Sequence, residues 1–355
     1  MTAPAEHQTG AKDFLATWTG RAPGIALSAA VALAAYFAAP QLARILPVPA
    51  IVIALIIGVA LNPWVAARPV FLPGMVFCVK TLLRGAVALL GIRVSVGEII
   101  ALGPLTAGLV VFAMAVTLAA AMGFARLSRQ SLFYGALAGA GTAVCGASAT
   151  LATATVLPNY PGKDADIAFV VVTTNSLATL AMVVYPPLCA LIGFDPQMTG
   201  VMLGGTIHDV AQVVGAGYSV SALVGNIAVI VKLFRVLLLL PTVLGIGWFL
   251  TRSGVRRGEA RVPVPVFALV FIALCIVNSL VLLAPGAVPD YGQIKALMIA
   301  ASNWGLLLAI GALGLGTSIT AIYALGWRAI ATVIGTTVTI LVVVTGGLLL
   351  LRLFV

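Results

Sequence analysis

Long apolar runs that follow one another along almost the whole chain limit how it can fold. A helix that crosses a bilayer needs about 20 largely apolar residues. Hydrophobic residues make up 62% of the 355, and charged residues only 8%, against about 25% in globular domains. The sequence therefore predicts an all-α polytopic membrane protein. This composition argues against a soluble enzyme, a disordered scaffold, a nucleic-acid binder and a disulfide-stapled secreted domain.

The apolar runs predict about eleven transmembrane helices in one transmembrane domain, residues 22–351, behind a polar tail at residues 1–21. The expected spans are residues 22–40, 49–62, 75–92, 104–125, 133–157, 165–192, 198–220, 225–250, 262–284, 294–319 and 327–351.

Basic residues in the connections predict the orientation, because cytoplasmic loops are enriched in Lys and Arg. The side that holds the N-terminus carries Lys12, Arg21, Arg68, Arg126, Arg129, Arg252, Arg256, Arg257, Arg261 and Arg328. The other side carries only Arg44, Arg93, Lys163, Lys295 and Arg352. We therefore expect a cytoplasmic N-terminal tail and a periplasmic or extracellular C-terminus.

Two similar basic segments inside spans indicate an internal repeat. Val79–Arg84 reads VKTLLR and Val231–Arg235 reads VKLFR, five spans apart. An odd number of spans places the copies in opposite orientation, as in many transporters. We expect inverted five-helix repeats at 49–192 and 198–351, with 22–40 as an extra helix.

Two neighbouring residues fit the same register, because Gly58 and Asn62 have the spacing of Gly204 and His208. A rival register aligns residues 91–103 with 314–326 but leaves no complete second copy. Chance similarity is the remaining alternative.

Glycines cluster in the fifth and tenth spans, at Gly135, Gly139, Gly141 and Gly146, and at Gly305, Gly311, Gly314 and Gly316. Glycine inside a helix costs about 1 kcal/mol relative to alanine. One explanation is close helix packing through small residues. The other, which two such spans favour, is a pair of broken helices whose free N–H groups and half-helix dipoles bind an ion.

The seventh span holds the most polar stretch, with His208 next to Asp209 and Gln212 one turn later. On a helix His208 and Gln212 share a face, and Asp209 points elsewhere. Asp209 could merely cap or pair locally near an interface. The functional reading is that His208 carries a proton during transport while Asp209 orients it or neutralises a basic residue.

Basic residues outnumber acidic ones inside the spans, where Lys80, Arg84, Lys232 and Arg235 face only Asp209. Some of them could snorkel to an interface from a helix end. A positive excess without an internal partner otherwise predicts an anion as the missing partner. The four cysteines form no CxxC pair and have no histidine at metal-ligand spacing, so we expect buried thiols and neither metal nor cofactor.

Three stretches together resemble a known family: AVCGASA at 143–149, GGTIHDVAQVV at 204–214, and the helix from Lys232 through Arg235 to Pro241. They are similar to the YeiH-type sulfate exporter family, from about the second span to the C-terminus. The resemblance implies a fold of the cation/proton-antiporter and bile-acid-symporter kind. Such a fold has a core bundle with two crossing broken helices and a separate panel.

These observations favour a secondary transporter of a small anion, sulfate or a sulfonate-like or carboxylate relative, in a bacterial inner membrane. We expect export coupled to protons or sodium, with His208 and Asp209 in proton coupling and a homodimer as one possible assembly. The expected substrate-binding residues are Lys80, Arg84, Thr142, Cys145, Gly146, Ser148, Lys232, Arg235, Gly314, Thr317 and Ser318.

Three alternatives stay open. An anion channel would share the broken helices. An intramembrane hydrolase could use Ser148 or Cys145 with His208 and Asp209. However, adjacent residues on one helix point apart, so we expect no enzyme. A cation/proton antiporter would need buried carboxylates, which the two glycine-rich spans lack.

Overall fold

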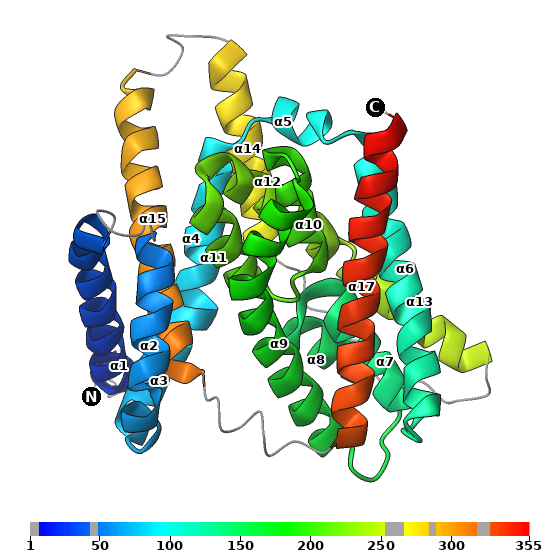
Figure 1. Ribbon diagram of the computed structural model, residues 1–355. Helices are drawn as coiled ribbons and strands as arrows, with labels where there is room; N and C mark the ends of the chain where they lie inside the picture. Colours follow the sequence, from blue (N-terminus) through cyan, green and yellow to red (C-terminus); the bar gives the residue numbers. More distant parts are fainter. Residues whose placement is uncertain (1–6, 43–48, 253–265, 284–288, 318–326, 355) are drawn as a thin grey trace, which may run out of the picture. The chain divides into compact units, whose positions relative to one another are not determined.

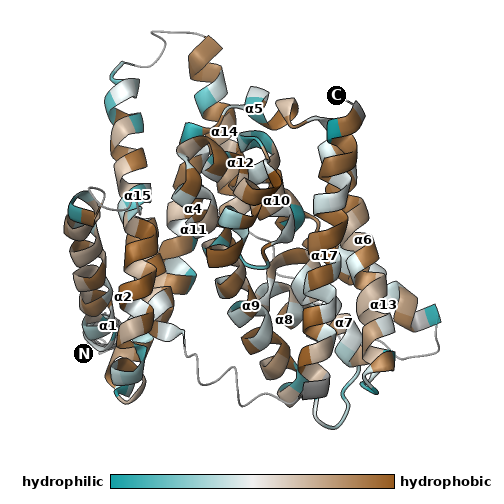
Figure 2. Ribbon diagram, viewed as in Figure 1, coloured by the Kyte–Doolittle hydropathy of each residue, from teal (hydrophilic) through white to brown (hydrophobic). Residues whose placement is uncertain are grey.

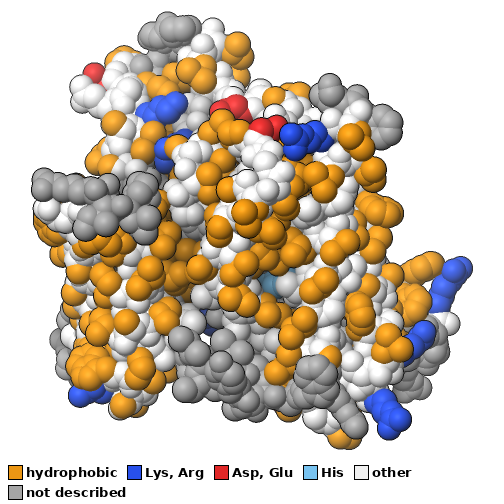
Figure 3. Space-filling view, viewed as in Figure 1, with side chains coloured by type: hydrophobic (Ala, Val, Ile, Leu, Met, Phe, Trp, Pro, Cys, Tyr) orange, Lys and Arg blue, Asp and Glu red, His pale blue; other side chains and the backbone are white. Residues whose placement is uncertain are grey.

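The computed structural model describes residues 7–42, 49–252, 266–283, 289–317 and 327–354, and within these ranges the regular structure is helical. Eight continuous helical segments within these ranges are long and apolar enough to cross a membrane. They are hydrophobic over most of their length (Figure 2). Hydrophobic side chains also cover most of the face drawn in Figure 3. The chain is therefore a multi-pass membrane protein, as its composition predicts.

The chain divides into two compact units, Met1–Leu90 with Asp290–Ser318 (unit 1) and Gly91–Pro289 with Ile319–Val355 (unit 2). Unit 1 contains α1 (His7–Leu42), α2 (Ala50–Ala66), the 3-10 turn η1 (Pro69–Phe71), α3 (Leu72–Phe77), the π-helical turn η2 (Cys78–Leu82), α4 (Leu83–Leu89) and α15 (Tyr291–Gly316). The 3-10 turn η3 (Leu90–Arg93) leads into unit 2.

Unit 2 holds the remaining helices, labelled in Figure 1. They are α5 (Val96–Ala101), α6 (Gly103–Leu127), α7 (Leu132–Ala140), the π-helical turn η4 (Gly141–Cys145), α8 (Ala147–Val156), α9 (Lys163–Ile192), α10 (Pro196–Thr206), α11 (Val210–Val220), α12 (Ala222–Leu237), α13 (Leu239–Arg252), α14 (Val266–Leu283) and α17 (Trp327–Phe354). The division into units does not coincide with the predicted repeats.

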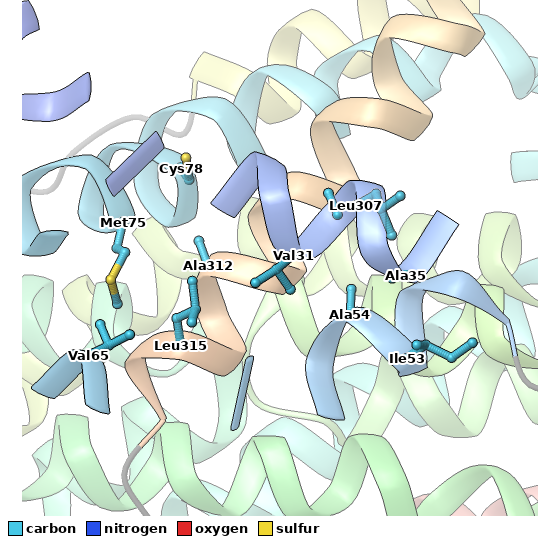
Figure 4. Close-up of a cluster of buried hydrophobic side chains, with 11 residues drawn as sticks. Val31, Ala35, Ile53, Ala54, Val65, Met75, Cys78, Leu307, Ala312 and Leu315 are labelled. Atoms are coloured by element: carbon cyan, nitrogen blue, oxygen red, sulfur yellow. The ribbon is translucent and has the colours of Figure 1, made fainter. Parts of the chain in front are cut away.

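Unit 1 is held together by small residues on α1, α2 and α15 that let the helix backbones approach closely. Figure 4 shows side chains of these helices and of the segment around Cys78 forming its buried core. At Gly58 a Cβ atom would lie 2.7 Å from the carbonyl oxygen of Gly311 and 2.8 Å from the Cα atom of Gly314. This contact is the small-residue packing known from membrane helices.

Gly58→Leu should therefore destabilise unit 1, because α15 cannot keep its distance from α2. We expect the midpoint of thermal unfolding in detergent to fall by several degrees. Gly85→Ala on α4 is the matched control, since a Cβ atom there meets nothing within 4 Å. Equal midpoints for the two variants would show that the α2–α15 contact contributes little.

Unit 2 surrounds two interrupted helices with longer ones. Helix α12 packs against both α10 and α11, and α6 packs against both α7 and α17. Side chains cap the starts of several helices: Ser131 at α7, Asp195 at α10 and Ser221 at α12 each accept a backbone N–H. Such caps stabilise helix starts that would otherwise leave donors unpaired.

Each expected span overlaps a helix, but three do not form single long helices. The second is the 17-residue helix α2, and the fifth and seventh are the interrupted pairs α7–α8 and α10–α11. A count of eleven crossings and the inverted repeats therefore stay predictions. Buried, unpaired thiols are confirmed at Cys78, Cys145, Cys189 and Cys275.

The break expected in the tenth span stays a prediction, because α15 ends at Gly316, inside that span, and the described residues stop at Thr317. Helix α15 runs without interruption past Gly305 and Gly311 and ends at Gly316. Its glycines take part in close packing: a Cβ atom at Gly314 would lie 2.6 Å from the carbonyl oxygen of Leu55 on α2. Residues 318–326 lie outside the described part of the chain.

Candidate functional site

The first interruption separates α7 from α8 in the glycine-rich fifth span. The turn η4 is π-helical, and the N–H of Gly146 donates to the carbonyl of Gly141 at 2.8 Å. Gly146 then adopts φ 60° and ψ −125°, a conformation that only glycine reaches easily. The helix thus stops at Gly146 and starts again at Ala147, as the glycine cluster predicts for this span.

The second interruption lies in the seventh span, where α10 ends at Thr206 and α11 begins at Val210. The linking residues are Ile207, His208 and Asp209. A Cβ atom at Gly146 would lie 3.7 Å from Cβ of Asp209 and 3.8 Å from the carbonyl oxygen of His208. The two interruptions therefore meet, although the sequence places the second broken helix elsewhere.

Lys232 on α12 joins the two interruptions. Its Nζ donates to the carbonyl oxygens of Val144 at 2.7 Å, Ile207 at 2.9 Å and His208. The side chain is completely buried. An interrupted helix leaves carbonyl groups without partners at its C-terminal end, and this ammonium group satisfies carbonyls from both helices.

Arg235 lies one turn further along α12 and is also completely buried. Nε and Nη2 donate to Ala143, Nη2 also donates to Thr142, and Nη1 donates to Gly204 and Ile207, all at 2.8–3.1 Å. These five bonds use the five N–H donors of a guanidinium group. Lys232 likewise uses its three.

Lys232 and Arg235 are among the residues predicted to bind substrate, and the structure places them at the interruptions. Their donors all point to backbone carbonyls, so a direct contact with an anion would require these bonds to break. With their donors occupied, the two side chains can attract an anion through their positive charges.

His208 has both ring nitrogens engaged. Nδ1 lies 3.2 Å from the carbonyl oxygen of Thr142, and Nε2 lies 2.9 Å from Oγ1 of Thr337 on α17. Thr337 Oγ1 also lies 2.7 Å from the carbonyl oxygen of Val333. Sequence reasoning missed Thr337, because a threonine in an apolar helix carries no signal that links it to a histidine 129 residues earlier.

The meeting point combines buried and half-buried residues. Residues 141–146 and 204–208 are buried, whereas Ala147, Ser148 and Asp209 are half-buried. These three residues mark the N-terminal ends of α8 and α11, and neither end has a side-chain cap. Two helix N-termini thus lie at the half-buried part of the junction, where their dipoles favour a negative charge.

Gln212, in the first turn of α11, extends this polar surface. Its Nε2 donates to Asn175 Oδ1 at 3.1 Å and to Thr179 Oγ1 at 3.3 Å on α9. Its Oε1 is buried and has no partner within the described residues. Asn175 and Thr179 are half-buried, and polar side chains at membrane depth usually face a cavity or the protein interior.

The other predicted site residues belong partly to unit 1 and partly to the first interruption of unit 2. Lys80 and Arg84 are exposed side chains of unit 1. Gly314 packs against α2, and Thr317 Oγ1 donates to the carbonyl of Leu313 at 2.8 Å. Ser318 lies outside the described residues. Thr142 and Cys145 belong to η4 and are buried, and Ser148 opens α8.

Metal-ligating groups and surface depressions are two further features that can be compared with the predicted site residues. The described residues contain no group of three His, Cys, Asp or Glu side chains suited to a metal ion. A depression of about 390 Å³ is lined by residues 159, 160 and 162–165 at the start of α9. It includes none of the predicted site residues.

The chain is similar to one protein family and to several membrane proteins. The family profile described as "Conserved hypothetical protein 698" matches residues 23–333. The UPF0324 membrane protein TauZ of Paracoccus pantotrophus is 41% identical over 332 residues, 93% of this chain and 95% of TauZ. The UPF0324 membrane protein CT0845 of Chlorobaculum tepidum is 36% identical over 327 residues, 92% of this chain and 88% of that protein. No solved structure matches the chain.

Proposed function

Because the chain belongs to the UPF0324 membrane protein family, we propose that it is a secondary transporter of a small anion. This family is the YeiH-type family that the motifs resemble. The proposed cargo is sulfate or a sulfonate-like or carboxylate relative, exported across a bacterial inner membrane with coupling to protons or sodium.

The observation that carries this proposal is the meeting of two interrupted helices in unit 2. The N-termini of α8 and α11 bring the positive ends of their helix dipoles to the half-buried part of this junction, and Ser148 adds a hydroxyl there. Lys232 and Arg235 lie behind them and outnumber the single carboxylate of Asp209. Helix N-termini directed at an anionic substrate from discontinuous helices are a recurring transporter design.

The contacts of His208 support a role in proton coupling rather than in hydrolysis. A neutral ring can donate from Nδ1 to Thr142 and accept from the Thr337 hydroxyl. A protonated ring can donate from Nε2 to that hydroxyl, which then donates to Val333. Rotation of one hydroxyl thus accommodates both forms. In the described structure the ring nitrogens face Thr142 and Thr337, whereas a hydrolase would need them directed at a nucleophile and at Asp209.

Arginine–tryptophan pairs support the proposed cytoplasmic N-terminal side. Arg68 stacks on Trp64 at 4.0 Å and Arg252 on Trp248 at 4.5 Å, each within its own unit. Both pairs lie at helix ends on the side predicted to be cytoplasmic. Tryptophan is enriched at membrane interfaces and Arg on the cytoplasmic side. These four residues therefore fit an interfacial anchor.

Counterflow of radiolabelled sulfate tests the proposed function. Purified protein in liposomes loaded with unlabelled sulfate should accumulate label transiently, in a saturable way, and chloride, taurine and small carboxylates serve as competitors. Flux that only follows the electrochemical gradient would indicate a channel instead. Absence of counterflow with every anion, in folded protein, would contradict an anion carrier.

The same assay at two internal pH values tests His208. If the ring carries the coupled proton, His208→Ala should abolish the pH dependence of transport. Thr337→Val should shift that dependence, because the hydroxyl that serves both forms of the ring is gone. An unchanged pH profile in the two variants would make His208 a structural residue.

A further inference from the structure

Carbonyl groups from both interruptions converge on one point inside unit 2. They come from Val144 at the end of η4 and from Ile207 and His208 in the link between α10 and α11. In transporters with discontinuous helices, unwound carbonyls and C-terminal half-helix ends coordinate the coupling sodium ion. Here the nitrogen of Lys232 lies at the point where these oxygens meet.

The three carbonyl oxygens around Lys232 equal in number the three N–H donors of a protonated lysine. An ammonium group has three N–H donors and no acceptor, and three carbonyl oxygens surround it. A neutral amine would present a lone pair to one of these oxygens. The side chain is fully buried, and a buried cation persists only when such partners compensate its lost hydration.

Arg235, like Lys232, donates hydrogen bonds to carbonyl groups of both interrupted helices. It shares the carbonyl of Ile207 with Lys232 and binds those of Thr142, Ala143 and Gly204. The side chains of Lys232 and Arg235 together donate to the carbonyl groups of the two interruptions that face α12.

We propose that the Lys232 ammonium group is a resident cation, which occupies the monovalent-cation site formed by the two interrupted helices. If the chain is the anion carrier proposed above, transport requires no sodium ion at this site. Removing the lysine side chain should open a cage of three carbonyl oxygens to a small monovalent cation from solution.

The wild-type protein gives the first test. Its midpoint of thermal unfolding in detergent is compared in choline, sodium and ethylammonium chloride at equal ionic strength. We expect the three midpoints to agree within about 1 °C, because the site is already filled. A midpoint several degrees higher in sodium than in choline would show that the site is still open to sodium in the wild-type protein, and would overturn the proposal.

Lys232→Ala gives the second test. This variant should unfold at a lower temperature than wild type in choline, and sodium or ethylammonium should raise its midpoint by about 5 °C or more. Lys80→Ala is the matched control, because that lysine is exposed in unit 1, and it should show no such response. A Lys232→Ala protein that stays unfolded in all three salts, or folds without responding to either cation, would contradict the proposal.

These unfolding measurements need no transported substrate, so they separate this inference from the proposed function. A cation response of Lys232→Ala together with absent anion counterflow would leave the resident cation in place and remove the anion carrier. Anion counterflow by the wild-type protein without a cation response of Lys232→Ala would support the anion carrier and contradict the resident cation.

Discussion

Arg235→Gln should abolish transport and lower the midpoint of thermal unfolding more than any other single substitution considered for unit 2. Glutamine can replace at most two of the five donors that Arg235 directs at carbonyl oxygens. The buried carbonyls of Ala143 and Gly204 would lose the donors that Arg235 supplies, whereas Ile207 would keep Lys232 and Thr142 would keep His208. Leaving a buried carbonyl without its donor typically costs about 1–3 kcal/mol for each group.

The measurement is sulfate counterflow beside thermal unfolding in detergent, with Arg84→Gln as the control. Arg84 is an arginine within a predicted span too, but its side chain is exposed, so its loss should leave the midpoint nearly unchanged. If Arg84→Gln lowered anion affinity without changing stability, Arg84 would have a direct role in binding. Equal loss of stability in both variants would contradict the special place given to Arg235.

Gly146→Ala should also cost most of the activity, for a different reason. The space around Gly146 admits a Cβ atom, since the nearest atom would lie 3.7 Å away. The strain lies in the backbone, because φ 60° with ψ −125° is a glycine conformation. We expect a loss of about 1–3 kcal/mol in stability, and a shift of the N-terminus of α8 away from Asp209.

Gly123→Ala on α6 is the control for Gly146→Ala. It also replaces a glycine in a membrane helix where a Cβ atom meets nothing within 4 Å, but its backbone is helical, so alanine should keep or slightly raise stability. Counterflow and thermal unfolding distinguish the two variants. Equal behaviour would mean that the interruption at Gly146 is not required for function.

The sequence predicts the parts of this fold that depend on local chemistry. Apolar runs give the helices, because a bilayer leaves few other ways to satisfy a backbone. The glycine cluster before Gly146 predicts the first interruption. The rarity of Lys and Arg inside apolar spans points to Lys232 and Arg235, the two side chains that hold the candidate site together.

Other features depend on partners that no local pattern reveals. The glycines of α15 resemble those of the fifth span, yet they pack against Gly58 and leave the helix intact through Gly316. The second interruption, at Ile207–Asp209, contains neither glycine nor proline. The contact of His208 with Thr337 joins helices that are distant in sequence. Each of these outcomes is decided by tertiary packing.

Lys232 and Arg235, three residues apart on α12, also limit how the site can move. Their bonds reach both interrupted helices, so pulling the two interruptions apart would expose carbonyl oxygens and two bare charges together. Alternating access by opening this junction would therefore be costly at every cycle. In the proposed anion carrier, the helices α7, α8, α10, α11 and α12 would therefore move together as one rigid body, and the bound anion would move with them.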